Sequence, residues 1–246
     1  MVQQSNIAAY SIHVRGLVQG VGFRPFIYRL AVNFKLSGWV ENRNDGVLIM
    51  VEGKEESIAG FLRHIRDEAP VASIIESVSQ VPVVPEGMNN FKVRKSKNIS
   101  DNVTLISPDI SVCNDCLGDM KTQPHRVDYP FINCTNCGPR FSIIRDLPYD
   151  RDKTTMDRFK MCHVCSSEYN DLNNRRFHAQ PVACNNCGPV YRLLINGTVF
   201  SGINEILGIL CGQLDSGGVV AMKGTGGFHL VCDAFNQGAV KKLRQI

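Results

Sequence analysis

The sequence predicts a mixed α+β protein made of three successive parts, and two observations lead to this fold class. Hydrophobic patterns over the first 95 residues follow the order strand, helix, strand, strand, helix, strand, which is the ferredoxin-like split βαβ arrangement. A polar run at 96–101, predicted to be a linker, leads into a cysteine-rich stretch, and after it comes a shorter segment with the strand and helix patterns of a beginning α/β unit. We place the three parts at residues 1–96, 97–190 and 191–246.

The composition is that of a globular protein. Hydrophobic side chains make up 43% of the 246 residues, and the net charge of +4 is scattered, so charge alone gives no reason to expect nucleic-acid binding. No stretch has the roughly 18 to 20 apolar residues of a membrane helix, and the first residues lack the pattern of a signal peptide. We therefore expect a cytoplasmic protein with no membrane partner.

The elements of the first part follow from the spacing of its apolar residues. Phe23, Ile27 and Leu30 recur at helical spacing, and a second helix is marked in the same way around Phe61. Alternation predicts strands, and Asn44-Asp-Gly46 between two of them is a hairpin signal. The expected elements are a strand at 9–14, a helix at 23–31, strands at 39–44 and 47–51, a helix at 58–65, and strands at 72–81 and 90–95.

The loop at 15–21, between the first strand and the first helix, carries a chemical signal. Backbone N–H groups in a glycine-containing turn that enters a helix form an anion site, and the helix dipole adds to it. Arg24 lies in the first helical turn, where a cation is unfavourable unless an anion binds beside it, and its planar guanidinium suits two phosphoryl oxygens. On spacing alone, a solvated Arg24 with Gly20 and Gly22 as simple turn residues explains the pattern equally well.

The motifs Val18-Gln-Gly-Val21, Phe23-Arg24 and Gly38-Trp-Val-Glu-Asn42 make the segment from about residue 7 to 95 closely resemble acylphosphatase. The resemblance implies two catalytic residues: Arg24 binds the substrate phosphate together with the loop amides, and Asn42 positions the attacking water. No covalent nucleophile is then needed, and His13 is expected to be a strand residue rather than a general base. The implied phosphate-binding residues are Val18, Gln19, Gly20, Val21, Gly22, Phe23 and Arg24.

Eight cysteines form four Cys-x-x-Cys pairs between residues 113 and 187. The first two pairs are separated by 17 residues and the last two pairs by 18, which indicates one unit used twice. Each copy also has an acidic residue, Asp119 or Glu168, three places after its second cysteine. Such pairs and spacers are typical of zinc ribbons, with an iron–sulfur cluster as the second choice. The pairs are Cys113/Cys116, Cys134/Cys137, Cys162/Cys165 and Cys184/Cys187.

We expect two structural zinc ions, because four thiolates fill each tetrahedral site and leave no position for water or substrate. Disulfides are the competing interpretation, and nothing in the sequence suggests export. One zinc per repeat is the favoured pairing, with an exchange of pairs between the repeats left open. His163 and His178 are not expected to be ligands. Cys211 and Cys232, outside the array, are expected to be buried and inert.

The last part begins with a hairpin signal at Asn196-Gly197. Apolar residues at helical spacing follow over 203–214, and then comes a strand at 217–223 that is predicted to be buried. Lys223 and the glycines after it can contact a nucleotide phosphate, although the segment is neither a Walker loop nor a dinucleotide fingerprint. Another helix is expected to begin near Gln237. About 55 residues are too few for a complete α/β core, so we expect this part to be incomplete.

The order of these parts, with the motifs Phe131-Ile-Asn-Cys-Thr-Asn-Cys-Gly-Pro-Arg140, Arg175-Arg-Phe-His-Ala-Gln-Pro181 and Lys223-Gly-Thr-Gly-Gly-Phe-His-Leu-Val-Cys-Asp-Ala234, resembles the N-terminal third of the carbamoyltransferases that mature [NiFe]-hydrogenases, the HypF family. The resemblance implies hydrolysis of carbamoyl phosphate by the first part and use of ATP by a complete YrdC-like domain. It also implies transfer of the carbamoyl group to a HypE-type acceptor protein by a domain expected to be absent here. Binding of double-stranded RNA, which only the YrdC analogy suggests, is not expected.

We expect a fragment of such an enzyme that hydrolyses carbamoyl phosphate or another acyl phosphate, and two other functions compete with it. An independent acylphosphatase with a zinc appendage leaves the motif at 223–234 unexplained. A zinc-ribbon module for nucleic acid or protein, with an inert phosphate loop, predicts salt-dependent binding to DNA or RNA. The sparse alternation of aromatic and basic residues argues against such a module.

Overall fold

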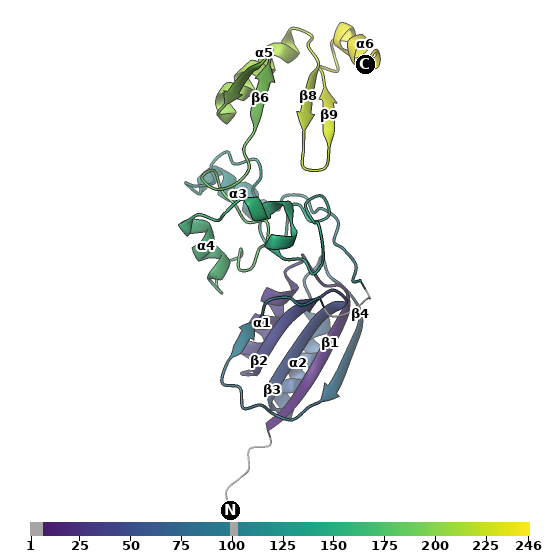
Figure 1. Cartoon of the computed structure of the whole chain (residues 1–246), viewed down its shortest axis with the longest axis vertical. Coiled ribbons are helices and arrows are strands. Elements are labelled where there is room, and N and C mark those ends of the chain that lie inside the picture. Colours follow the sequence, from purple (N-terminus) through teal and green to yellow (C-terminus); the bar gives the residue numbers. More distant parts are fainter. Residues whose placement is uncertain (1–6, 99–102) are drawn as a thin grey trace, which may run out of the picture.

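The structure is a computed structural model that describes residues 7–98 and 103–246. Its three parts follow one another along the long axis of the molecule, with the N-terminal sheet at one end, the cysteine-rich part in the middle and the C-terminal segment at the other end (Figure 1). The mixed α+β class predicted from the sequence is confirmed.

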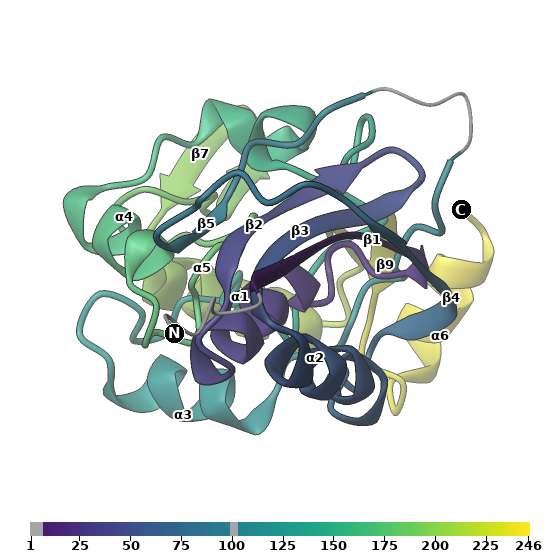
Figure 2. The same cartoon turned by 90° about the horizontal axis from the view of Figure 1, so that it is seen from below.

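The N-terminal part is one five-stranded sheet with two helices on one face. Its elements are β1 (Ile7–Leu17), α1 (Phe23–Asn33), β2 (Ser37–Arg43), β3 (Gly46–Lys54), α2 (Glu55–Asp67), β4 (Ile74–Pro82) and β5 (Phe91–Val93). The strands lie in the order β4-β1-β3-β2-β5, and all neighbours are antiparallel except β2 and β5, which run parallel. Figure 2 shows α1 and α2 together beneath the sheet. This is the predicted ferredoxin-like arrangement with one further strand at the edge.

The core between the sheet and the helices explains the spacing seen in the sequence. Helix α1 buries Phe23, Ile27 and Leu30 along one face, and α2 buries Phe61 and Ile65 in the same way. Alternate residues of the strands point inward to meet them. Each such side chain, when fully buried, stabilises the fold by about 1.5–3 kcal/mol. The inward strand residues include Ile12, Val14, Val40, Val47, Ile49 and Val51.

The segment after β5 does not leave the sheet at once. The backbone N–H of Lys97 donates to the carbonyl of Asn42 (3.0 Å), so the chain continues beside β2. The polar run at 96–101, predicted to be a linker, is therefore joined to the sheet edge at Lys97, because the backbone still finds a partner there. Residues 99–101 of that run lie outside the described residues.

The cysteine-rich part has little regular structure. It holds α3 (Asn114–Thr122), the short 3-10 helices η1 (Arg151–Lys153) and η2 (Thr155–Arg158), and α4 (His163–Asn170). Helices α3 and α4 are equivalent in the two repeats, since each begins directly after the first cysteine of its repeat, Cys113 or Cys162. Buried side chains gather in two small clusters that include the cysteines. This part therefore depends on its cysteines for a stable shape.

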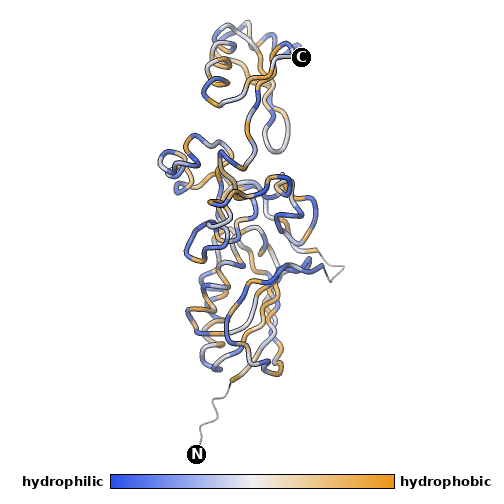
Figure 3. The backbone as a smooth tube through the Cα atoms, turned by 60° about the vertical axis from the view of Figure 1, so that its left-hand side comes forward, coloured by the Kyte–Doolittle hydropathy of each residue, from blue (hydrophilic) through white to orange (hydrophobic). Residues whose placement is uncertain are grey.

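The C-terminal segment consists of two hairpins and two helices. Its elements are β6 (Arg192–Ile195), β7 (Thr198–Ser201), α5 (Ile203–Asp215), β8 (Val220–Lys223), β9 (Phe228–Val231) and α6 (Gln237–Arg244). The hairpin predicted at Asn196-Gly197 joins β6 to β7. Figure 3 shows hydrophobic stretches in this segment as well as in the N-terminal sheet. Within the described ranges, no helix is long and apolar enough to cross a membrane.

Two expectations about burial in this segment are wrong. In β8, predicted to be a buried strand, Val220 is half-buried and the three residues after it are exposed. Cys211 is exposed on α5, and Cys232 is half-buried rather than buried. The cause is the same in both cases, because α5 fully buries only Ile206 and β8 pairs only with β9 among the described residues.

Candidate phosphate site and cysteine clusters

The loop at residues 18–22 between β1 and α1, here called the phosphate loop, presents backbone N–H groups that lack a partner among the described residues. Gly20 and Gly22 have φ angles of 72° and 77°, a conformation that costs little only for glycine, and Gly22 is the N-cap of α1. Among the described residues, no acceptor receives the N–H groups of residues 19–23. N–H groups in a largely buried loop need a partner, so the loop suits an anion at the start of α1.

The side chain of Gln19 fixes this loop in place. Its Nε2 donates to the carbonyls of Arg43 (2.5 Å) and Gly46 (3.0 Å), which lie at the turn between β2 and β3. Its Oε1 accepts from the backbone N–H of Tyr149 (2.9 Å) in the cysteine-rich part. The amide of Gln19 thus joins the loop to both parts, and only its backbone is left to bind a phosphate.

The structure brings together the two predicted catalytic residues, Arg24 in α1 and Asn42 in β2. The side-chain oxygen of Asn42, in the amide orientation that its neighbours require, accepts from Nε (3.1 Å) and Nη2 (3.2 Å) of Arg24. Both residues are buried, with 7% and 1% of their surface exposed. A guanidinium fixed at the mouth of an N–H-rich loop is suited to bind phosphoryl oxygens in pairs.

Residues of the cysteine-rich part close the pocket over this loop. The pocket has a volume of about 20 Å³, and the loop, Arg24 and Asn42 form one side of it. The opposite wall consists of Thr135, Arg140, Tyr149, His178, Ala179, Gln180 and Pro181. The motif at 175–181 was distinctive in the sequence, but the sequence analysis assigned it no role at the site. In the structure it supplies four residues of this wall.

Arg140 connects the phosphate loop to the first group of cysteines. Its Nε donates to the carbonyl of Gly20, and its Nη1 and Nη2 donate to the carbonyls of Cys137 (3.1 Å) and Cys134 (3.2 Å). Only 2% of this residue is exposed, so its charge acts in a medium of low dielectric constant. The positive charge of Arg140 therefore favours an anion at Gly20.

His178 contributes a neutral imidazole to the wall. Burial, with a smaller contribution from the charge of Arg24, lowers the pKa of His178 to about 4, although Asp150 opposes this shift. The backbone of His178 has a φ of 55°, which is uncommon for a residue other than glycine. The ring is therefore uncharged at neutral pH.

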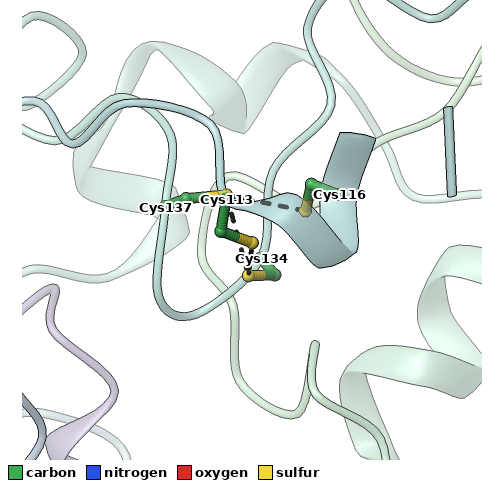
Figure 4. Close-up of side chains that lie close together, drawn as sticks. All are labelled: Cys113, Cys116, Cys134 and Cys137. Atoms are coloured by element: carbon green, nitrogen blue, oxygen red, sulfur yellow. Dashed lines mark hydrogen bonds between the residues drawn. The ribbon is translucent and has the colours of Figure 1, made fainter. Parts of the chain in front are cut away.

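The eight cysteine sulfurs form two groups of four, one in each repeat. Within each group the Sγ atoms all lie within 4.8 Å of one another. Figure 4 shows the first group, in which the sulfurs of two loops and of α3 approach one another. The pairing within each repeat is the one favoured from the sequence, and neither group includes His163 or His178. Four sulfurs at this separation suit a tetrahedral zinc ion.

Two further residues singled out in the sequence lie outside the pocket. His13 is in β1, and its ring is paired with Asp45 (Nε2 to Oδ1, 3.3 Å), which agrees with a strand role. Lys223 ends β8, and its ammonium group lies 5.4 Å from the centre of the Phe228 ring. A contact between Lys223 and a nucleotide phosphate stays a prediction.

Sequence reasoning missed three further partners of Arg24. Its Nη1 donates to Oγ of Ser96 (3.2 Å), and its Nη2 donates to the carbonyl of Tyr149 (3.2 Å) and to Oδ1 of Asp150 (2.7 Å). Ser96 lies in the run predicted to be a linker, and Tyr149 and Asp150 lie in a loop with no motif. No local pattern in the sequence could have revealed them.

Comparison with known families gives matches in the same order as the three parts. The family model described as Acylphosphatase matches residues 10–93, and the model described as HypF finger matches 112–144 and 161–194. The model described as Telomere recombination, of the Sua5/YciO/YrdC type, matches 212–246.

Curated relatives match nearly the whole chain. The carbamoyltransferase HypF of Rhodobacter capsulatus is 45% identical over 240 residues, which cover 96% of this chain and 31% of the relative. The probable carbamoyltransferase HypF of Methanocaldococcus jannaschii is 40% identical and covers 95% of this chain and 31% of its own length. The acylphosphatase of Thermotoga petrophila is 39% identical over 87 residues, 35% of this chain and 96% of the relative.

A solved structure extends this likeness to the arrangement of the parts. The crystal structure of full-length HypF in the phosphate- and nucleotide-bound form superposes on all of this chain, with 43% identity and a TM-score of 0.91. The match covers 32% of that chain. The crystal structure of T. kodakarensis HypF, at 46% identity and a TM-score of 0.84, covers 97% of this chain and 30% of its own.

An acylphosphatase-like domain, a double cysteine finger and a YrdC-like segment in one chain define the class of protein. The chain belongs to the HypF family and is an N-terminal portion of such a carbamoyltransferase. It spans about a third of the length of the curated relatives it matches. The recognition predicted from the sequence is thereby confirmed.

Proposed function

We propose that this chain hydrolyses acyl phosphates, carbamoyl phosphate among them, to the carboxylate and inorganic phosphate. The observation that carries the proposal is that loop N–H groups, which have no partner in the described part of the chain, converge with Arg24 and Asn42 in one pocket. The acylphosphatase match over residues 10–93 supports the same reaction. The names of the relatives support carbamoyl phosphate as the particular acyl phosphate.

The reaction needs positioning and electrostatic stabilisation rather than a covalent nucleophile. The loop N–H groups of residues 19–23 and the guanidinium of Arg24 take the phosphoryl oxygens, where negative charge develops. Asn42 orients a water molecule in line with the bond to the acyl oxygen. The water attacks phosphorus, the bond between phosphorus and the acyl oxygen breaks, and the carboxylate leaves with that electron pair.

The wall contributed by the cysteine-rich part favours a small acyl group. His178, Gln180 and Tyr149 stand opposite the loop around a pocket of about 20 Å³. A carbamoyl or acetyl group needs less displacement of this wall than an aromatic acyl group does. We therefore expect carbamoyl phosphate and acetyl phosphate to be better substrates than benzoyl phosphate.

Each cysteine group, in this proposal, holds one structural zinc ion. The first is bound by Cys113, Cys116, Cys134 and Cys137, and the second by Cys162, Cys165, Cys184 and Cys187. Four sulfurs leave no coordination position for a substrate, so the metal maintains the shape of the wall and takes no part in hydrolysis.

The remaining roles belong to the whole protein of which the relatives are examples. They are use of ATP by a complete YrdC-like domain, transfer of the carbamoyl group to a HypE-type acceptor in hydrogenase maturation, and location in the cytoplasm. Binding of double-stranded RNA is not proposed.

The test is phosphate release from carbamoyl phosphate by the zinc-loaded chain. We expect Arg24→Ala and Asn42→Ala to lower kcat/KM by about 100- to 1000-fold, the effect of removing one preorganised donor from an active site. Arg145→Ala is the matched control, because Arg145 forms an exposed ion pair with Asp157 in the cysteine-rich part. Equal phosphate release by the unaltered chain and by both site variants, at equal zinc content, would instead support a binding module with an inert loop.

A further inference from the structure

The carboxylate of Asp150 is the only negative charge paired with Arg24 among the described residues. Nη2 of Arg24 lies 2.7 Å from Oδ1 of Asp150 and 3.2 Å from the carbonyl of Tyr149, and Nη1 lies 3.2 Å from Oγ of Ser96. Asn42 accepts from Nε and Nη2. A guanidinium has five N–H donors, and these contacts occupy most of them.

The pocket beside Arg24 has no room for a phosphoryl group in this arrangement. A volume of about 20 Å³ accommodates roughly one water molecule. A phosphoryl group also needs two N–H donors from one edge of the guanidinium, and it carries the same sign of charge as Asp150. Two anions at one guanidinium repel each other strongly in a buried site. One partner of Arg24 must therefore leave when a phosphoryl group binds.

Asp150 is the partner best placed to leave. Its side chain is 23% exposed, whereas that of Arg24, which lines the pocket, is 8% exposed. The carboxylate makes no second hydrogen bond among the described residues. Tyr149, in contrast, is 4% exposed and its backbone is held by the side chain of Gln19.

We propose that the carboxylate of Asp150 competes with the phosphoryl group of the substrate for Arg24. The cysteine-rich part in this way keeps the phosphate site closed until a phosphorylated ligand displaces the carboxylate. The inference rests on the proposed function, which assigns phosphate binding to Arg24. The acylphosphatase of Thermotoga petrophila is matched along 96% of its length by 87 residues of this chain. It therefore has no counterpart of the cysteine-rich part, which is where the competing carboxylate comes from.

The experiment compares the zinc-loaded chain with Asp150→Asn by calorimetric titration with inorganic phosphate at fixed ionic strength. The substitution keeps the shape of the side chain and removes its charge. We expect phosphate to bind about tenfold more tightly, equivalent to about 1.4 kcal/mol. For carbamoyl phosphate we expect KM to fall several-fold while kcat changes by no more than about twofold.

Asp157→Asn is the matched control. Asp157 forms an ion pair of the same length (2.7 Å) in the same part of the chain, but its partner is Arg145, which does not line the pocket, whereas Asp150 is paired with Arg24, which does. It should leave the phosphate Kd unchanged. Weaker phosphate binding by Asp150→Asn would show that the carboxylate positions Arg24 instead, and an unchanged Kd would show that it is no competitor. Either result overturns the proposal. Failure of both the unaltered chain and Asp150→Asn to bind phosphate at millimolar concentration overturns it as well.

The two proposals can fail separately. Tighter phosphate binding by Asp150→Asn without hydrolysis by any form of the chain would retain the competition and reject acyl-phosphate hydrolysis. Hydrolysis that is lost in Arg24→Ala, together with an unchanged Kd in Asp150→Asn, would retain the reaction and reject the competition.

Discussion

Arg126 and Arg176 hold equivalent positions in the two cysteine repeats, and each inserts its guanidinium into the repeat of the other. Nη2 of Arg126 donates to Oε2 of Glu168 (2.5 Å), and Nη2 of Arg176 donates to Oδ2 of Asp119 (2.6 Å). Asp119 and Glu168 occupy the same place in the two repeats, three residues after the second cysteine. The two guanidinium groups are almost completely buried, with side-chain exposures of 0% and 1%.

The two arginines also donate to backbone carbonyls of the opposite repeat. Nε of Arg126 donates to the carbonyl of Ala183 (3.0 Å), and Nε of Arg176 donates to the carbonyl of Asn133 (3.1 Å). Each of these carbonyls belongs to the residue directly before the third cysteine of a repeat. The two repeats are therefore bound to each other through both charge and backbone, so they form one cooperative unit rather than two independent fingers.

Arg126→Ala should destabilise both repeats. It leaves the carboxylate of Glu168 buried without its main partner, and breaking a buried pair in this way costs about 3 to 5 kcal/mol. Calorimetric thermal unfolding of the zinc-loaded chain measures the loss, and release of zinc to a coloured chelator shows whether the second repeat opens first. Arg145→Ala, which removes an exposed pair, should cost less than about 1 kcal/mol. Equal unfolding temperatures for the two variants would contradict the cooperative unit.

Arg140→Ala should impair the first cysteine cluster and the phosphate loop together. The side chain donates to the carbonyl of Gly20 in the loop and to those of Cys134 and Cys137 in the cluster, and the substitution leaves these acceptors without donors. We expect the Kd for inorganic phosphate to rise at least tenfold and zinc to be released faster, with the two effects measured on the same sample. Arg140→Lys keeps the charge but cannot span the carbonyls, so it should recover part of the phosphate affinity only. A loss confined to zinc or to phosphate would separate two features that the contacts of Arg140 join.

The elements that the sequence revealed are those determined by local spacing. The apolar face through Phe23, Ile27 and Leu30 predicted α1, and Asn44-Asp-Gly46 predicted the turn between β2 and β3, because both patterns act over a few residues. The grouping of cysteines by repeat followed from spacing in the same way. A strand was expected at 90–95, where β5 lies, but its parallel pairing with β2 was not predicted, since such pairing depends on distant residues.

The wall of the phosphate pocket depends on contacts between distant positions and had no local signal. Arg24 meets Asp150 across 126 residues of sequence, and Arg140 meets Gly20 across 120. Neither pairing follows from helical or strand periodicity, which reports only on neighbours. Burial in the C-terminal segment was overestimated for a related reason. An apolar strand such as β8 is buried only where another element covers it, and spacing alone does not show that element.

The contribution of His178 to stability should depend on pH. The pKa of this ring falls from its ordinary value of 6.5 to about 4 in the folded chain, mainly through burial, with Arg24 adding to the shift and Asp150 opposing it. The unfolded chain therefore binds a proton between pH 6.5 and 4 that the folded chain excludes, and stability falls as pH falls through this range. Above pH 6.5 the contribution is complete.

The measurement is the thermal unfolding midpoint of the chain and of His178→Gln at pH 7, 6 and 5. Acid also weakens the binding of zinc by thiolates, but it does so in both proteins, so the difference between them isolates His178. We expect the advantage of the unaltered chain over His178→Gln to shrink as pH falls. A difference that stays constant from pH 7 to 5 would mean that the ring titrates at its ordinary pKa.

Gly22→Ala should weaken phosphate binding through the backbone alone. At φ 77° an added Cβ has ordinary contact with Thr135 at 3.5 Å, so the substitution introduces strain rather than a clash. A residue with Cβ in this conformation costs about 1–2 kcal/mol, and relief of that strain rotates the N–H groups away from the anion position. We expect a Kd for inorganic phosphate at least tenfold higher than that of the unaltered chain.

Gly87→Ala supplies the matched control for Gly22→Ala. Gly87 has nearly the same φ, 74°, and nothing lies within 4 Å of the added Cβ, so the strain is similar but far from the loop. Both variants should lose similar stability in thermal unfolding, and only Gly22→Ala should lose phosphate affinity. Because the stability losses match, a difference in Kd must come from the direction of the loop N–H groups. Equal Kd values for the two variants would leave Gly22 a turn residue and remove the loop backbone from the phosphate site.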